Sequence, residues 1–172
     1  QVITYRRWRT DDTSPLGLAW KDAHTLAVLM KKDDALSLVL LRTDGTVAPR
    51  KLTLPVESKG KGWPSLTISP DGKRMVLSTG SQVLFMDGDG KVLKSVHRKE
   101  EEGLLFCPTF SPDSKRVAFK RMVGKGEPGT HTTAIVFYSP EGRLVARVPV
   151  PPGKLPKSRP ATRSQPATGP GN

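Results

Sequence analysis

Two segments of the sequence are copies of one another, and this repeat constrains the fold more than any other feature. The segments 66–77 and 108–119 begin 42 residues apart. Each contains Ser-Pro-Asp, then Lys-Arg, then an apolar run. A weaker copy, 18–29, begins 48 residues before the first of them. Internal similarity at a period of about 40–45 residues is typical of repeat architectures, so we interpret the chain as a short array.

Each unit also has a second half, and these halves repeat in the same order. An acidic-Gly turn follows four apolar residues in the segments 38–45, 83–90 and 135–142. A returning strand is expected after each turn, at 46–47, 91–94 and 143–148. The pattern therefore predicts four short antiparallel strands in each unit.

The shared Ser-Pro-Asp motif has the chemistry of a tight chain reversal. Proline sets φ for the second position of a type I turn, Asp suits the third position and Gly suits the fourth. We therefore assign a structural role in the blade turns to these residues. They are Ser69, Pro70, Asp71, Gly72, Ser111, Pro112 and Asp113.

The strand after each turn is continuously apolar, as in 75–77 and 117–119. A sheet with one wet face alternates polar and apolar residues, so a continuous run indicates that both faces are covered. Stacked four-stranded units of this length are typical of β-propeller blades. We predict an all-β chain of about three such blades, a partial propeller. The expected blade boundaries are 10–58, 59–104 and 105–150.

The two stronger copies, 68–77 and 110–119, resemble the repeat of TolB-type propellers, a WD-repeat-like bacterial family. They are also similar to the propeller domains of prolyl-oligopeptidase-type proteins. The first unit departs from the motif, since Trp20-Lys-Asp-Ala-His24 replaces Ser-Pro-Asp-Gly. The resemblance implies a protein-binding scaffold that is often extracytoplasmic. Blades host unrelated activities, so the motif indicates a fold more than a function.

Three blades are too few to close a ring, because closed propellers have at least about four. Either further blades outside this chain or self-association with another subunit would then cover the open ends. We favour the first, a fragment of a larger propeller. Residues 1–9 are expected to form a strand of a preceding blade or an N-terminal extension. The sequence begins at Gln1 and shows no signal-peptide pattern, so it does not indicate the cellular compartment of the protein.

Residues 151–172 differ sharply in composition from the rest. Leu155 is the one large apolar residue in this segment, which is rich in Pro and carries no acidic residue. Such a segment cannot bury enough surface to offset its ordering entropy, so we expect a disordered basic tail. Four charges of the net +12 belong to it. These are Lys154, Lys157, Arg159 and Arg163.

The sequence contains no motif with the residue spacing of a known catalytic or metal-binding site, so we expect no catalytic residue, no cofactor and no metal. The pair Asp87 and Asp89 suggests a calcium loop, but the EF-hand register fails and a hairpin turn fits better. The three histidines share no short ligand spacing. Cys107, the single cysteine, is expected to be a buried structural thiol. No apolar run approaches the roughly 18 residues of a membrane span.

Two kinds of feature are candidates for partner binding. The first is a cluster of basic and aromatic side chains near the start, Arg6, Arg7, Trp8 and Arg9, which suits phosphates and stacked bases. The second is a pair of long connections, 57–63 and 122–133, because long loops on a rigid scaffold tend to carry binding function. From the second connection we single out Lys125, Glu127 and His131.

These observations favour a non-catalytic propeller scaffold that binds another, unidentified protein through rim loops. A first alternative is the propeller portion of a larger prolyl-oligopeptidase-like hydrolase whose catalytic domain is absent from this sequence. A second alternative is polyanion or nucleic-acid binding through the basic N-terminal cluster and the tail. Only 6% of the residues are aromatic, which disfavours a nucleic-acid platform.

Overall fold

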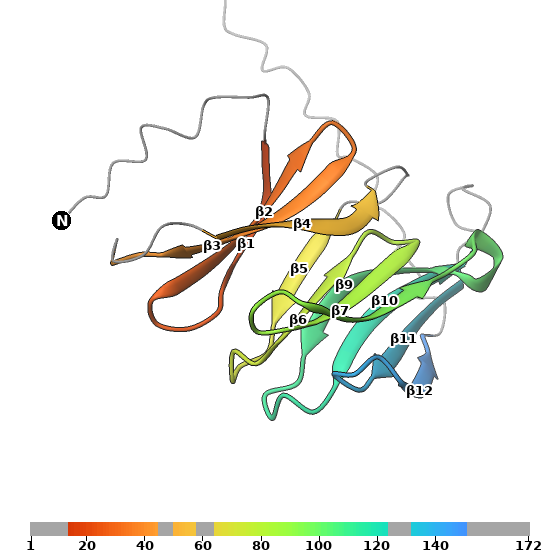
Figure 1. The fold of residues 1–172 in the computed structure, drawn as a ribbon. Helices are drawn as coiled ribbons and strands as arrows, with labels where there is room; N and C mark the ends of the chain where they lie inside the picture. The colour runs from red at the N-terminus through yellow and green to blue at the C-terminus, as the bar shows by residue number, and fades with distance from the viewer. Residues whose placement is uncertain (1–13, 45–49, 58–63, 124–131, 151–172) are drawn as a thin grey trace, which may run out of the picture.

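A computed structural model describes residues 14–44, 50–57, 64–123 and 132–150, and these residues form three four-stranded antiparallel sheets (Figure 1). Each sheet is a simple meander in which consecutive strands pair. The first sheet contains β1 (Ser14–Trp20), β2 (Thr25–Lys32), β3 (Ala35–Arg42) and β4 (Arg50–Glu57). The second contains β5 (Ser65–Ile68), β6 (Arg74–Ser78), β7 (Gln82–Asp87) and β8 (Val92–His97). The third contains β9 (Leu104–Phe110), β10 (Val117–Val123), β11 (Thr132–Tyr138) and β12 (Leu144–Pro149).

This architecture confirms the predicted fold class: the chain is all-β and consists of propeller-like blades in an open stack. The one helical element among the described residues is a single 3-10 turn, η1 (Glu100–Glu102), between the second and third sheets. The first strand of the second sheet, β5, lies beside both β1 and β9. The three sheets therefore stand side by side with their first strands together, as blades do around a propeller axis (Figure 1).

The second sheet is buried on both faces, which explains its continuous apolar runs. Met75 and Leu77 on β6 face the first sheet, whereas Val76 between them faces the third. The four central residues of β7 divide in the same way and are all fully buried. Toward the first sheet, the cluster comprises Ala27, Leu29, Leu36, Leu38, Leu54, Val56, Met75, Leu77, Leu84 and Met86. Toward the third sheet, it comprises Val76, Val83, Phe85, Leu105, Phe110, Val117, Phe119, Val136 and Tyr138.

Three aromatic rings form the centre of the contact between the second and third sheets. Phe85 lies 6.3 Å from Phe119 and 5.9 Å from Tyr138, measured between ring centroids. Phe119 and Tyr138 lie 5.4 Å apart with their planes at 79°. The two contacts of Phe119 are edge-to-face, and the Phe85 and Tyr138 rings are tilted by 41°. Edge-to-face contacts match the ring quadrupoles and add to the stabilisation from burial. The two sheets are thus joined by a packed aromatic core.

The first repeat unit is offset by one residue from the predicted alignment. The turn between β1 and β2 is closed by Lys21 N–H donating to the Thr25 carbonyl, whereas Ser69 N–H donates to the Arg74 carbonyl in the second unit. The first turn is therefore one residue shorter, and Thr25 rather than Leu26 corresponds to Arg74. The structure describes the returning strand of the first sheet over Arg50–Glu57, and the expected 46–47 lie outside the described residues.

The prediction of a buried Cys107 is wrong, since its side chain is exposed. Opposite this residue the pairing of β9 with β10 shifts register, so that Ala118 pairs with Thr109 but Lys120 pairs with Phe106. Cys107 sits in the resulting β-bulge with a φ of 51°. The bulge breaks the inward–outward alternation of the strand and turns the thiol toward solvent.

We predict that Phe85→Ala lowers the free energy of unfolding by about 3–5 kcal/mol. Phe85 is fully buried in the aromatic core, so its truncation leaves a cavity between two sheets. Urea denaturation followed by circular dichroism measures the change. Leu93→Ala is the control, because Leu93 is 45% exposed on β8. Equal, small losses for both variants would contradict face-to-face packing of the second and third sheets.

Candidate functional site

The blade stack has two ends, which differ in their loops. At the turn end, short turns within 21–25, 69–74, 87–91, 111–116 and 139–143 reverse the chain. Two of them, β5–β6 and β9–β10, lie at the bottom of Figure 1. At the opposite loop end, β4 and β10 stop at Glu57 and Val123, and the long connections follow. Because strands alternate in direction, both long connections leave from this same end.

At the turn end, the Ser-Pro-Asp motif forms a small hydrogen-bond network. The Ser69 hydroxyl donates to the Asp71 carboxylate over 2.6 Å and accepts from the Arg74 N–H over 2.9 Å. The same carboxylate accepts from the Lys73 N–H over 3.1 Å. Gly72, with a φ of 69°, closes the turn by donating its N–H to the Ser69 carbonyl. The polar groups of the motif therefore form the hydrogen bonds that reverse the chain, which is the structural role predicted for them.

The third blade repeats this network almost atom for atom. The Ser111 hydroxyl donates to Asp113 over 2.6 Å, and the Lys115 N–H donates to the same carboxylate over 3.0 Å. Ser114 takes the place of Gly72 with a φ of 61°. Its hydroxyl also accepts from the Asp71 N–H over 3.3 Å, which links the turns of the second and third blades.

Hydrogen bonding holds the aspartates of these turns in their charged form. The Ser69 hydroxyl, followed by the Lys73 N–H, lowers the pKa of Asp71 below its ordinary value. The Ser111 hydroxyl and the Lys115 N–H lower the pKa of Asp113 in the same way. In the first blade, the His24 N–H lowers the pKa of Asp22. Asp22 is therefore the counterpart of the motif aspartate, although the sequence around it hides this.

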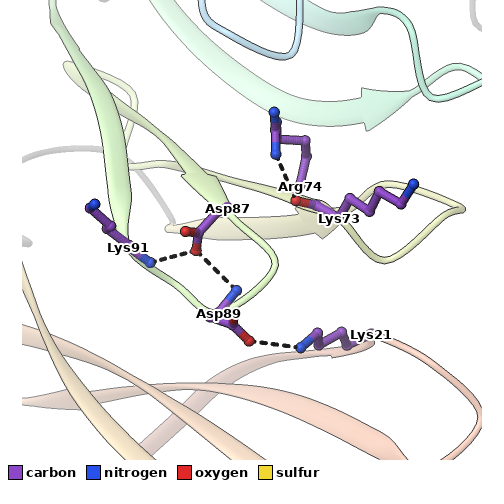
Figure 2. Close-up of polar contacts among 6 residues, drawn as sticks. All are labelled: Lys21, Lys73, Arg74, Asp87, Asp89 and Lys91. Carbon is purple, nitrogen blue, oxygen red and sulfur yellow. Dashed lines mark hydrogen bonds and ion pairs between the residues drawn. The ribbon is translucent and has the colours of Figure 1, made fainter.

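The acidic turn between β7 and β8 also has a structural role. The Asp87 carboxylate accepts the N–H groups of Asp89 and Lys91 over 3.0 and 2.9 Å (Figure 2). Asp89 itself forms an ion pair with Lys21 of the first blade over 3.2 Å (Figure 2). This is a hairpin turn that ties two blades together. Among the described residues, no group of three His, Cys, Asp or Glu side chains is arranged to hold a metal ion.

The loop end contains an arginine cluster that sequence reasoning missed. Arg98, in the link between the second and third blades, donates to the carbonyls of Gly103 and Glu102 over 2.8 and 2.7 Å. It also donates to the Tyr138 hydroxyl over 3.2 Å. Arg121 on β10 donates to the same Glu102 carbonyl over 2.8 Å. Two guanidinium groups are thus held side by side by main-chain oxygens.

Three positively charged side chains, Arg98, Arg121 and Arg147, interact electrostatically in this cluster. Partial desolvation, and then the charges of Arg147 and Arg98, lower the pKa of Arg121 below its ordinary value. None of the ion pairs found among the described residues involves these three arginines. Arg98 lies in the link before the third blade, Arg121 on β10 and Arg147 on β12. They are 23 or more residues apart in sequence, so no local motif signals their meeting. The charge of Glu102 acts in the opposite direction on the pKa of Arg121 and offsets part of this repulsion.

The predicted partner-binding residues lie outside the described part of the chain. They are Arg6, Arg7, Trp8, Arg9, Lys125, Glu127 and His131. The structure describes the anchors of the second connection, however, and β10 carries Arg121 two residues before it ends at Val123. β10 therefore ends close to the arginine cluster, and the connection with Lys125, Glu127 and His131 follows it in the sequence. The described residues include no helix with the length and apolarity needed to cross a membrane.

Comparison with known proteins supports the fold and leaves the function open. No family model matches the sequence, and no curated protein matches it. One similar solved structure is described as the "Crystal structure of the eukaryotic initiation factor", with a TM-score of 0.57 and 13% identity. The likeness covers 81% of this chain and 33% of that one, so this chain spans about a third of its length. At this identity the likeness shows the fold alone.

We predict that Ser69→Ala raises the pKa of Asp71 toward its ordinary value, because it removes the strongest hydrogen bond to the carboxylate. A lowered folded-state pKa gives stability that is present above about pH 4 and is lost as the pH falls through that folded pKa. The variant should therefore lose less stability on acidification than the wild type.

An NMR titration of the side-chain carboxyl carbons measures the change. Asp113 is the internal control, because its own donor, Ser111, is untouched in this variant. An Asp71 titration that is identical in both proteins would contradict the assigned hydrogen bond.

Proposed function

We propose that this chain is a non-catalytic β-propeller scaffold that binds another protein through its loop end. The Ser-Pro-Asp-Gly-Lys-Arg turn, which resembles the TolB-type repeat, favours this function. The observation that carries the proposal is the arginine pair at the loop end, next to the start of a long connection. The partner should present an acidic segment, because the cluster offers fixed donors and brings Arg98, Arg121 and Arg147 together with the charge of Glu102 offsetting only part of theirs.

The scaffold supplies rigidity, which lowers the entropy lost on binding. Arg98 is held by three acceptors, so its guanidinium is oriented before any partner arrives. Arginine is enriched among the residues that dominate binding energy at protein interfaces. The turn end is less suited to this role, because the carboxylates of Asp71, Asp87 and Asp113 are already engaged in closing turns.

We include in the proposed surface the connection that follows β10 in the sequence and carries Lys125, Glu127 and His131. Polar residues at the rim of an interface help to select among partners. We assign no catalytic role to the chain, since the carboxylates that the motif repeats serve turn hydrogen bonds.

We predict that Arg121→Glu abolishes retention of the partner by the immobilised full chain. The expected loss is at least about tenfold, equivalent to about 1.4 kcal/mol, because the change reverses a charge within the cluster. Quantitative mass spectrometry of proteins captured from an extract of the source cells measures it. The variant's melting temperature is recorded in parallel to show that it folds.

The matched control is Lys115→Glu, the same charge reversal on an exposed side chain at the turn end. Proteins that bind the loop end are retained by the wild type and by this control. Loss with Lys115→Glu but not with Arg121→Glu would place binding at the turn end and overturn the proposal. The absence of any protein retained by the wild type would also contradict it.

A further inference from the structure

Two arginines of the loop-end cluster lie on the face of the third sheet that packs against the second sheet. Phe119 on β10 and Val136 on β11 pair with each other and are buried on this face. Arg121 lies two residues beyond Phe119 on β10, and Arg147 on β12 pairs with Val136. Side chains alternate along a strand, and paired residues share a face. Arg121 and Arg147 therefore lie on the same face of the sheet.

Arg98 joins them from the link between the second and third sheets. Its guanidinium is held by two main-chain carbonyls and by the Tyr138 hydroxyl. One of these carbonyls, that of Glu102, also accepts from Arg121, so a single oxygen holds Arg98 and Arg121 next to each other. After desolvation, the charges of Arg147 and Arg98 are the next causes that lower the pKa of Arg121. The three guanidinium groups are therefore close enough to repel one another.

Most hydrogen-bond donors of these side chains are unused within the described part of the chain. A guanidinium has five N–H donors. Arg98 donates three hydrogen bonds, Arg121 donates one and Arg147 donates none among the described residues. The Tyr138 hydroxyl accepts from Arg98, and its own hydrogen has no acceptor among these residues. Tyr138 is 4% exposed, so the cluster includes a buried hydroxyl donor besides its guanidinium groups.

The net charge of the cluster distinguishes between the anions that it could hold. Glu102 offsets one of the three guanidinium charges, because it acts on Arg121 in the opposite direction. Two positive charges remain. A carboxylate and a nucleic-acid phosphodiester each carry one negative charge, whereas a phosphorylated side chain carries about 1.5 to 2 at pH 7 and has three acceptor oxygens. The phosphoryl group therefore fits both the charge and the unused donors.

The basic residues of the turn end differ from the cluster in this respect. In the β5–β6 turn, the charges of Lys73 and Arg74 act on the Asp71 carboxylate. The β9–β10 turn repeats this arrangement around Asp113. Each turn thus has one carboxylate for two cations, and both carboxylates also close the turns through hydrogen bonds. A dianion therefore meets more positive charge at the loop end than in either of these turns.

We propose that the arginine cluster binds a phosphorylated side chain within the acidic segment of the partner. Recognition of this group rests on the proposed function and deepens it, because the phosphoryl group belongs to the same partner. Arg98 and Arg121, held by the Glu102 carbonyl, supply oriented guanidinium groups, and the exposed Arg147 on β12 supplies a third. A planar guanidinium binds two phosphate oxygens at once, and arginine clusters are a recurring means of recognising phosphorylated segments.

The first test is a titration of the full 172-residue chain with phenyl phosphate, and with benzoate as a matched monoanion at the same ionic strength. The side-chain Nε–Hε signals of Arg98 and Arg121 are followed by NMR. Phenyl phosphate should shift both signals and bind at least about tenfold more tightly than benzoate, because it adds a charge and an acceptor oxygen. Equal affinities for the two anions would overturn the proposal.

Arg147→Gln removes one guanidinium and should weaken phenyl phosphate binding by about fivefold or more. Arg147 is exposed and donates no hydrogen bond among the described residues, so the melting temperature should be unchanged. The matched control is Arg143→Gln, which removes the same charge from an exposed arginine at the turn end of the same hairpin. It should leave the affinity unchanged. Equal weakening by both variants would indicate a general attraction of anions to a basic chain and would overturn the proposal.

Protein capture separates the phosphate site from the proposed function. The cell extract is divided, one half is treated with a protein phosphatase, and both halves are passed over the immobilised wild type. The partner should be retained from the untreated half and lost from the treated half. A partner that is retained equally from both halves, and lost with Arg121→Glu, would overturn the phosphate site and leave the proposed function standing. Retention of no protein from either half would overturn the proposed function, and the phosphate site with it.

Discussion

The burial of both faces of the second sheet is the constraint on which the rest of the structure depends. One repeat unit cannot bury its hydrophobic face alone, so each sheet needs a neighbour to cover that face. The second sheet meets this need on both sides, through Met75 and Leu77 toward one neighbour and Phe85 toward the other. The outer sheets each receive this support on one face. The second sheet is therefore well packed on both faces, and the first and third sheets have more exposed apolar residues than the second.

Polar contacts align the blades that the apolar core holds together. Lys21 pairs with Asp89 across the first contact, and Ser114 accepts the Asp71 N–H across the second. The Lys94 ammonium adds a bond to the Gly142 carbonyl over 2.9 Å. Exposed contacts of this kind contribute little free energy, but they set how neighbouring turns are placed. At the turn end, these contacts align neighbouring blades. The arginine cluster lies at the loop end, from which the long connections leave.

Most of the fold and little of the candidate site could be predicted from the sequence. Turn chemistry and apolar runs are local, so Ser69-Pro-Asp-Gly72 and the strands beside it predict hairpins and two-sided burial. The short first turn was misaligned by one residue, because Trp20-Lys-Asp-Ala-His24 contains the motif aspartate without its Ser and Gly. Cys107 was misplaced because a β-bulge depends on how two strands pair. Arg98 and Arg121 share the Glu102 carbonyl only after the link that contains η1 has packed against β10, and no local sequence pattern indicates that contact.

The sequence by itself thus determined the repeat, the strand content, the turn residues and the stacked character of the sheets. These follow from backbone preferences and from the period of the apolar residues, which act over a few positions. Tertiary structure alone decided which apolar residues face which neighbour, where the thiol of Cys107 points and which cations meet. Those outcomes depend on strand register and blade packing, which bring together residues far apart in the chain. Tertiary structure likewise decided which residues on the outer faces of the first and third sheets are exposed, because exposure depends on which sheets pack together.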